Sequence, residues 1–353
     1  MPVLTRLIPS PVVVDIRRGA LDDLAGLLAD QRISTSGKLA VAISEGSGRV
    51  LRERLAPALA GADWYPVANG TIDAAVQLAD DIKGNRYDAV VGLGGGKIID
   101  VAKYAAARVG MPMVAVATNL SHDGLCSPVA TLDNDNGRGS YGVPTPIAVV
   151  IDLDVIREAP ARYVRSGIGD AVSNISCVAD WELAHEVRNE DIDGLAAAMA
   201  RQAGEAVLRH PGDIGDDAFL KVLAEGLVLT GISMSIAGDS RPASGGCHEI
   251  NHAFDLLYPK RAASHGEQVG LGACFAMHLR GARDEARHMA SVLRRHRLPV
   301  RAEEIGFSAE EFVRAVDYAP QTRPGRFTIL EHLNLSTDQI RDAYADYAQA
   351  IDS

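Results

Sequence analysis

The sequence predicts an α/β domain with a parallel sheet over residues 1–155, followed by an all-α domain over residues 156–353. Up to about residue 155, short apolar runs alternate with helical patterns, whereas beyond it apolar residues recur only at helical spacing. Alternation of strands and helices favours a parallel sheet covered on both faces. A chain of 353 residues also suits two domains better than one core.

Short apolar runs mark the expected strands at residues 11–15, 38–44, 88–96, 113–118 and 147–153. Helical patterns separate them, among them GALDDLAGLLADQ (19–31) and IIDVAKYAAARVG (98–110). In the second half, helices are expected at residues 161–188, 192–209, 214–238, 241–257 and 265–295. The boundary is placed near Pro160, where the strand signals stop.

Composition and charge exclude several classes of protein. A hydrophobic share of 47% with 23% charged residues is typical of a folded globular chain, and a net charge of −11 argues against a nucleic-acid partner. Neither a signal-peptide pattern nor an apolar run near the roughly 20 residues of a membrane span is evident. The four cysteines form no CxxC pair. A cytoplasmic protein without a membrane span is therefore expected.

A glycine cluster follows the third expected strand. Gly94, Gly95 and Gly96 precede a helix that carries Asp100 in its first turn, and Lys97 adds a positive charge. Glycines let the backbone approach a ligand, and a helix N-terminus attracts phosphate, so this turn could cradle a pyrophosphate. The pattern is not GxGxxG, and a tight turn without a ligand remains the alternative.

A polar loop is expected at residues 117–132, after the next strand. Its hydroxyl, amide and carboxylate groups could bind a ribose or a nicotinamide at the carboxyl end of the sheet. Asp123 is a candidate for contacting a substrate hydroxyl. An ordinary polar surface loop is the alternative.

Three histidines in the helical half are candidates for a metal or substrate site. His248 and His252 are four residues apart and share one helix face, and His265 follows in ASHGEQVGLG. Together with Asp170, two imidazoles would suit a divalent ion with an open coordination position. Spacing does not show that these residues meet. Each histidine could instead flank a substrate or border an apolar surface, and Asp170 could pair with an arginine.

Five motifs resemble the glycerol-1-phosphate dehydrogenase family, in the superfamily of iron-containing alcohol dehydrogenases, glycerol dehydrogenase and dehydroquinate synthase. They are GLGGGKIIDVAKYAA, SHDGLCSPVAT, GDAVSNISCVADWELA, SRPASGGCHEINHAF and HGEQVGLG, in family order. The resemblance implies a Rossmann-like N-terminal domain, a helical C-terminal domain of the dehydroquinate synthase type, and a metal-dependent oxidoreductase that uses NAD or NADP.

The resemblance also implies roles for individual residues. The metal ligands fall on Asp170, His248 and His265, and the catalytic positions that face the substrate fall on Asp123 and His252. The expected cofactor-binding positions are Glu45, Gly94, Gly95, Gly96, Lys97, Asp100, Thr118, Asn119, Ser121, Ser127 and Val129.

Two departures from the resemblance bear on the metal and the cofactor. Iron-containing relatives usually have a histidine four residues beyond the aspartate, where this chain has Asn174. Three protein ligands suit Zn²⁺ better, with Fe²⁺ or another divalent metal as the alternative. Relatives that prefer NAD commonly have a carboxylate where this chain has Ser44, next to Glu45, so NAD and NADP both stay open.

The function expected on this basis is hydride transfer between NAD(P)(H) and a small phosphorylated polyol, with dihydroxyacetone phosphate and sn-glycerol 1-phosphate as first choice. The alternatives are a dehydrogenase of glycerol or another small alcohol, phosphate or phosphonate, and, in a different class, a cyclase similar to dehydroquinate synthase. A homo-oligomer is expected.

Some residues carry weaker expectations. A pocket for the substrate's anion could draw on Arg138, Arg241, Lys260 and Arg261, although each is also an ordinary surface charge taken singly. Cys247 is expected to be a packed thiol, and Trp181 a packing residue.

Overall fold

The computed structural model describes residues 8–46, 48–135, 137–261 and 263–352. The chain divides into two compact units, one ending at Pro160 and one beginning at Ala161. This division lies a few residues beyond the boundary expected at 155/156. The reason is helix α5 (Leu153–Glu158), which is capped by Asp152. The same carboxylate accepts hydrogen bonds from the N–H groups of Gly19 and Leu21, so α5 stays with the first unit.

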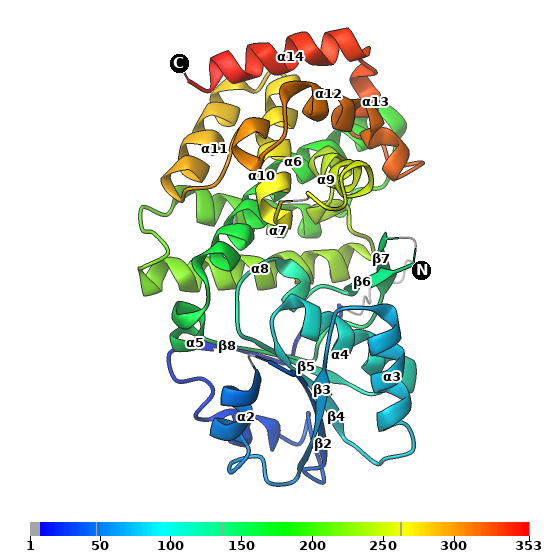
Figure 1. Ribbon diagram of the computed structural model, residues 1–353, viewed down its shortest axis with the longest axis vertical. Coiled ribbons are helices and arrows are strands. Elements are labelled where there is room, and N and C mark those ends of the chain that lie inside the picture. The colour runs from blue at the N-terminus through cyan, green and yellow to red at the C-terminus, as the bar shows by residue number, and fades with distance from the viewer. Residues whose placement is uncertain (1–7, 47, 136, 262, 353) are drawn as a thin grey trace, which may run out of the picture. The chain divides into compact units, whose positions relative to one another are not determined.

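The first unit is built on a six-stranded parallel sheet with the order β1-β8-β5-β4-β2-β3 (Figure 1). Its strands are β1 (Val13–Arg17), β2 (Leu39–Ser44), β3 (Ala62–Val67), β4 (Ala89–Gly94), β5 (Met113–Ala117) and β8 (Ala148–Asp152). The inner strands β4, β5 and β8 are buried throughout, as both faces of a parallel sheet are covered.

Helices and a small hairpin complete the first unit. They are α1 (Leu24–Leu28), α2 (Gly48–Leu55), α3 (Ile72–Ile82), α4 (Gly96–Val109), α5, the 3-10 turn η1 (Asp123–Leu125), and the hairpin of β6 (Val129–Asn134) with β7 (Gly137–Gly142). In Figure 1, α3 and α4 lie together on one side of the sheet. The helix expected at residues 19–31 is wrong in its extent, because only α1 forms there.

The sheet brings two of the singled-out segments to one edge. β4 and β5 are neighbours in register, with Gly94 opposite Ala117, and the N–H of Thr118 donates to the carbonyl of Gly94. β2 lies on the other side of β4 and ends at Ser44. The glycine turn therefore lies beside the start of the polar loop at the carboxyl end of the sheet, where such folds bind ligands.

The second unit has only helices among its described residues. They are α6 (Ala161–Arg188), α7 (Gly194–Arg209), α8 (Asp217–Ala237), η2 (Arg241–Ala243), α9 (Gly246–Leu257), α10 (His265–Leu279), α11 (Arg283–Arg295), η3 (Ala302–Ile305), α12 (Ala309–Tyr318), η4 (Ala319–Thr322), α13 (Ile329–Leu333) and α14 (Thr337–Ala350). The single helix expected at 265–295 is two helices, separated at Gly281, whose φ is 80°.

Helix α8 is an exception to the expectation that no apolar run approaches the length of a membrane span. Within the part of the chain that the structure describes, it is the one helix long and apolar enough to cross a membrane by length and composition. Two-thirds of its apolar window, 67%, is buried, and α8 packs against α7 and α6. Residues 1–7, on which part of the expectation about a signal peptide rests, lie outside the described residues.

Candidate functional site

Three helices of the second unit bring Asp170, His248 and His265 together. Asp170 lies on α6, His248 on α9, and His265 begins α10. An Asp170 oxygen lies 3.2 Å from Nε2 of His265 and 3.9 Å from Nε2 of His248, and the three donor atoms lie within 4.8 Å of one another. One carboxylate and two imidazoles in this arrangement suit a divalent ion. The group therefore fits the metal that the resemblance implies.

Glycines allow α6 and α10 to approach closely enough to form this cluster. A Cβ on Gly169 would overlap the carbonyl of Gly266, and a Cβ on Gly266 would overlap the carbonyl of Ser166. The hydroxyl of Ser166 also accepts from the N–H of Gly266 at 3.1 Å. Because Asp170 and His265 are the chain neighbours of these two glycines, the close helix contact places both side chains in one cluster.

Asn251 orients His265 from one side. Its Oδ1 lies 2.9 Å from Nδ1 of His265, and its amide nitrogen donates to Gln268. An amide that donates elsewhere presents its oxygen as an acceptor, which places the imidazole proton on Nδ1 and leaves the lone pair on Nε2 facing Asp170. Asn251 lies inside the motif SRPASGGCHEINHAF, but the resemblance implied no role for it.

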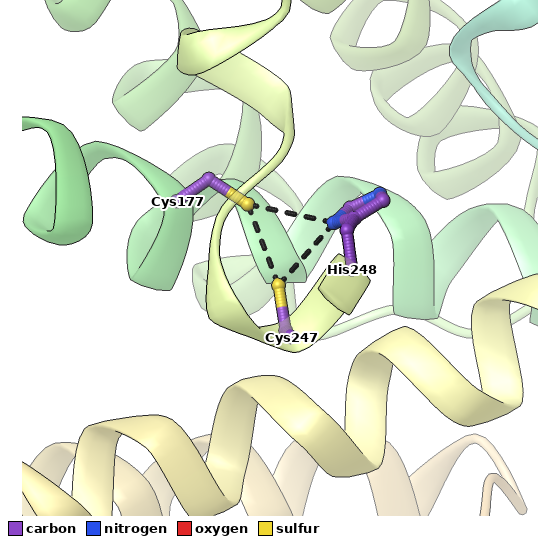
Figure 2. Close-up of side chains that lie close together, drawn as sticks. All are labelled: Cys177, Cys247 and His248. Carbon is purple, nitrogen blue, oxygen red and sulfur yellow. Dashed lines mark hydrogen bonds between the residues drawn. The ribbon is translucent and has the colours of Figure 1, made fainter. Parts of the chain in front are cut away.

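His248 has different neighbours on its two nitrogens. Nε2 faces Asp170, whereas Nδ1 lies 3.3 Å from Sγ of Cys247 and 3.7 Å from Sγ of Cys177 (Figure 2). Burial, and then the charge of His265, holds the pKa of His248 well below its ordinary value. The ring is therefore neutral, which is the form that binds a metal. Cys247 is buried, as expected for a packed thiol, but it also contacts this ring.

Asn174 and His252 flank the same cluster. The amide nitrogen of Asn174 donates to the hydroxyl of Thr230 on α8 at 2.7 Å, so this side chain is bonded to a neighbouring helix. His252 lies one turn beyond His248 on α9 and is half-buried. The charge of His252 contributes to lowering the pKa of His248.

At the glycine turn of the first unit, the N-terminus of α4 packs closely against the polar loop. Gly95 is the N-cap of α4 and has an ordinary φ of −79°, so the turn does not need glycine for its backbone angle. A Cβ there would instead overlap the amide nitrogen of Asn119, and a Cβ on Gly96 would overlap the ring of His122. The buried Oδ1 of Asn119 has no hydrogen-bond partner among the described residues. Such a cradle with an unpaired polar atom fits a dinucleotide.

Lys103 on α4 connects the helix after this turn with the polar loop through an ion pair and hydrogen bonds. Its ammonium is buried, lies 2.8 Å from the Asp100 carboxylate, and donates to the carbonyl groups of Gly124, Ser127 and Val129. Asp100 is 3% exposed, which favours a role as counter-ion of Lys103 over direct contact with a cofactor. Val129 begins β6, so the loop expected to run to 132 ends earlier. Neither Lys103 nor His122 was singled out from the sequence.

The remaining residues expected at the cofactor lie at the same edge of the sheet. Thr118 and Ser121 are half-buried after β5, and Lys97 is exposed on α4. The hydroxyl of Ser44 accepts from the N–H of Gly48, and Glu45 is exposed. Asp123 begins η1 and is half-buried.

The four basic residues weighed for an anion pocket have different local partners. Arg241 is buried in an ion pair with Glu190. The other three are exposed: Arg261 pairs with Glu311, Arg138 pairs with Asp133 on the hairpin of the first unit, and Lys260 precedes Arg261 in the segment after α9. Arg241 and Arg261 are thus engaged in ion pairs within the second unit, and a pocket shared by all four basic residues stays a prediction.

Two other arginines bond the segment just before α9, the helix that carries His248. Arg323 donates to the hydroxyl of Ser244 at 2.6 Å and approaches that of Ser240, while Arg326 bonds the carbonyl of Ser244 and the hydroxyl of Ser240. Burial lowers the pKa of both, to about 10 for Arg326, and the charge of Arg323 lowers the pKa of His248. Arg326 also lies 3.7 Å from a carboxylate oxygen of Asp239, whereas the hydrogen-bond acceptors given for Arg323 are neutral serine hydroxyls, which leaves its positive charge for an anion.

Comparison with known proteins agrees with the resemblance. The iron-containing alcohol dehydrogenase family matches residues 15–160. Relatives named as NAD(P)+ glycerol-1-phosphate dehydrogenases include one from Hyperthermus butylicus, 37% identical over 93% of this chain and 94% of its own, and one from Pyrococcus furiosus, 38% identical over 75% and 76%.

Solved structures share the fold over nearly the whole chain. A probable glycerol dehydrogenase from Sinorhizobium meliloti has a TM-score of 0.79 at 22% identity, covering 98% of this chain and 99% of its own. A sulfoacetaldehyde reductase from Bifidobacterium kashiwanohense has a TM-score of 0.70 at 15% identity, with the same coverage. The fold class expected from the sequence is confirmed. The chain belongs to the glycerol-1-phosphate dehydrogenase family, among the iron-containing alcohol dehydrogenases.

Proposed function

We propose that this protein is a metal-dependent, NAD(P)-linked dehydrogenase that interconverts dihydroxyacetone phosphate and sn-glycerol 1-phosphate. The observation that carries the proposal is the cluster of Asp170, His248 and His265 in a chain 37% identical to a named glycerol-1-phosphate dehydrogenase. When bound, the metal supplies a Lewis acid and the nicotinamide supplies the hydride.

The donor set favours Zn²⁺ over Fe²⁺. Asp170, His248 and His265 are three donors, and Asn174 is bonded away to Thr230. Three protein ligands with an open position are typical of catalytic zinc. Asn251 holds the Nε2 lone pair of His265 toward the ion, as carboxylate or carbonyl partners do in other zinc sites.

The glycine turn is the proposed cradle for the cofactor pyrophosphate. Backbone N–H groups at Gly95, Gly96 and Lys97 open helix α4, whose N-terminus favours negative charge. Asn119, with its unpaired oxygen, is the proposed partner for a donor group of the cofactor. Ser44 and the exposed Glu45 leave both NAD(H) and NADP(H) as the proposed cofactors.

Arg323 is the proposed counter-ion of the substrate phosphate. It is partly buried, its closest partners are serine hydroxyls, and its charge reaches His248. A guanidinium in such a setting binds a phosphate through two parallel hydrogen bonds. The hydroxyl groups of Ser244 and Ser240 accept hydrogen bonds from it.

His252 and Asp123 are the proposed residues that hold and move the proton of the substrate hydroxyl. Histidine is suited to this because its ordinary pKa lies near neutral pH, and one turn of helix places His252 beside His248.

Rates of NADH and NADPH oxidation by the zinc-loaded protein test the proposal. We expect dihydroxyacetone phosphate to react with a kcat/KM at least about 100-fold above that of dihydroxyacetone, since hydrogen bonds to a charged group contribute about 1.5–3 kcal/mol each. In the reverse direction, sn-glycerol 1-phosphate and not its enantiomer should be oxidised. Equal activity with both ketones would point to a glycerol dehydrogenase, and conversion without net NAD(P)H oxidation to a cyclase.

Arg323→Met isolates the phosphate contact. The variant should raise KM for dihydroxyacetone phosphate by roughly 10- to 100-fold while leaving the rate with dihydroxyacetone unchanged. Arg261→Met, which removes an exposed ion pair with Glu311, is the matched control and should change neither.

We propose in addition that the protein acts in the cytoplasm as a homo-oligomer. The four cysteines are unpaired thiols, which suits a reducing compartment. Sedimentation velocity of the purified protein measures the oligomeric state directly.

A further inference from the structure

Cys177 and Cys247 form a second donor cluster around His248, on the side away from Asp170. Cys177 lies on α6, and Cys247 directly precedes His248 on α9. The two sulfur atoms are 3.5 Å apart, and Nδ1 of His248 lies 3.7 Å from one and 3.3 Å from the other (Figure 2). All three side chains point toward one another, and both cysteines are fully buried.

These distances match the face of a coordination tetrahedron. With metal–sulfur bonds of about 2.3 Å and metal–nitrogen bonds of about 2.0–2.1 Å, tetrahedral geometry separates two sulfur ligands by about 3.8 Å and a sulfur from a nitrogen by about 3.5 Å. The observed separations of 3.5, 3.7 and 3.3 Å lie within a few tenths of these values. No large side-chain movement is needed to close the three donors on an ion.

We propose that Cys177, Cys247 and Nδ1 of His248 form a binding site for a thiophilic d¹⁰ cation such as Cd²⁺ or Zn²⁺. Thiolates select soft cations, whereas the Asp170 side of the cluster offers an oxygen donor. Binding releases two thiol protons to solvent, and the two thiolates then balance the charge of a divalent ion. A neutral complex is the form that a fully buried pocket tolerates.

The nearby carboxylate of Asp180 does not complete the set. It accepts hydrogen bonds from the N–H groups of Gly246 and Ile329 and pairs with Arg280. The site therefore has three protein donors among the described residues, and soft cations accept such low coordination more readily than hard ones.

One imidazole links the two clusters. Nε2 of His248 faces Asp170, and Nδ1 faces the sulfur atoms. A neutral imidazole has one nitrogen lone pair available for a metal. When a cation binds through Nδ1, Nε2 carries the proton and cannot bind a second ion unless the ring loses that proton. A cation in the sulfur site is therefore expected to lower the metal affinity of the cluster of Asp170, His248 and His265.

Cadmium titration of the purified, reduced protein tests the proposal. The readouts are the ultraviolet charge-transfer band of cadmium–thiolate bonds and the bound cadmium per chain. We expect one cadmium per chain to develop this band, and Cys177→Ala and Cys247→Ala each to lower the cadmium affinity of the sulfur site at least tenfold. Cys126→Ala and Cys274→Ala are matched controls, because both remove an equally buried thiol elsewhere, and both should keep the band.

The variant His265→Ala tests the sulfur site independently of the Asp170 cluster on which the proposed function rests. It disrupts the Asp170 cluster but leaves the sulfur donors in place, so the thiolate band should persist even where enzyme activity is lost. Thermal unfolding identifies any variant that does not fold, and serine then replaces alanine at that position. A band that survives loss of either Cys177 or Cys247, or no band in the folded wild-type protein, would overturn the proposal.

Discussion

Nδ1 of His265 lies 2.9 Å from Oδ1 of Asn251, so an asparagine on α9 sets the orientation of a histidine that begins α10. Gln268 fixes the asparagine in turn by accepting from its amide nitrogen. The direction of the His265 lone pair therefore depends on a chain of side chains that is buried behind it.

Removal of this support should weaken metal binding without abolishing it. Asn251→Ala leaves the three donors in place but frees the His265 ring, and we expect the affinity for zinc to fall roughly 10- to 100-fold. Competition with a chromophoric chelator measures this affinity. Asn174→Ala is the matched control, since Asn174 is an equally buried helical asparagine whose amide bonds Thr230, and its zinc affinity should stay unchanged.

His248 and His252 should fail differently although they share a helix face. His248→Ala removes one of three donors and should leave the site without stoichiometric zinc. His252→Ala should keep zinc and bind NAD(P)H normally but lower kcat by roughly 100-fold, the scale of a lost general acid–base group. Metal analysis and steady-state kinetics on both variants decide the matter. A zinc-loaded His252→Ala protein with full activity would contradict the proposed proton transfer.

The central part of the fold was predictable because its strands are uninterrupted. β4, β5 and β8 are continuous apolar runs that end at turn residues, which is the pattern of buried parallel strands. β3 escaped prediction because its sequence, ADWYPV, mixes polar and aromatic residues and contains Pro66. Proline is tolerated there because β3 is an edge strand, a fact that only the sheet order reveals.

The site was predictable only where a motif marks it. Asp170, His248 and His265 could be named from the family resemblance. Whether they lie together, however, depends on the contact between Gly169 and Gly266, two residues that are far apart in the sequence. Lys103 carried no expectation of its own, and it is buried. Arg323 belongs to no motif, and Cys177, although it lies in the motif of Asp170, was given no role; only tertiary packing brings its sulfur atom to His248.

A side chain at Gly95 should disturb the cofactor cradle and nothing else. In Gly95→Val the new Cβ overlaps the amide of Asn119 and closes the space above the helix N-terminus, so we expect NAD(P)H affinity to fall at least tenfold with zinc content unchanged. Fluorescence titration of NADH measures the first quantity. Gly26→Ala is the control in the same unit, because a Cβ there meets nothing within 4 Å.

Loss of Lys103 should cost stability rather than ligand affinity alone. Lys103→Met leaves the Asp100 carboxylate buried without its partner and removes the hydrogen bonds to the polar loop, so we expect a loss of about 3–5 kcal/mol in the free energy of unfolding. Urea denaturation measures it. The double variant with Asp100→Asn should recover part of the loss. Lys97→Met removes an exposed charge from the same helix and should change stability by less than about 0.5 kcal/mol.

His296 should make the second unit lose stability in mild acid. Burial, and then the charge of Arg295, lowers the pKa of this ring to about 4, and it stacks on Phe219 with centroids 4.7 Å apart. In the unfolded chain a histidine takes up its proton near pH 6.5. Between pH 6.5 and 4 only the unfolded state gains the proton, so the free energy of unfolding falls as the pH is lowered through this range and levels off below it. We expect His296→Phe, which keeps the stacked ring but cannot be protonated, to lose on the order of 2 kcal/mol less free energy of unfolding than the wild type between pH 7 and 4.5.

Urea denaturation at the two pH values measures this difference. The control is His288→Gln, which replaces an exposed histidine and should follow the wild type. Parallel pH dependence of wild type and His296→Phe would show that His296 does not govern acid stability.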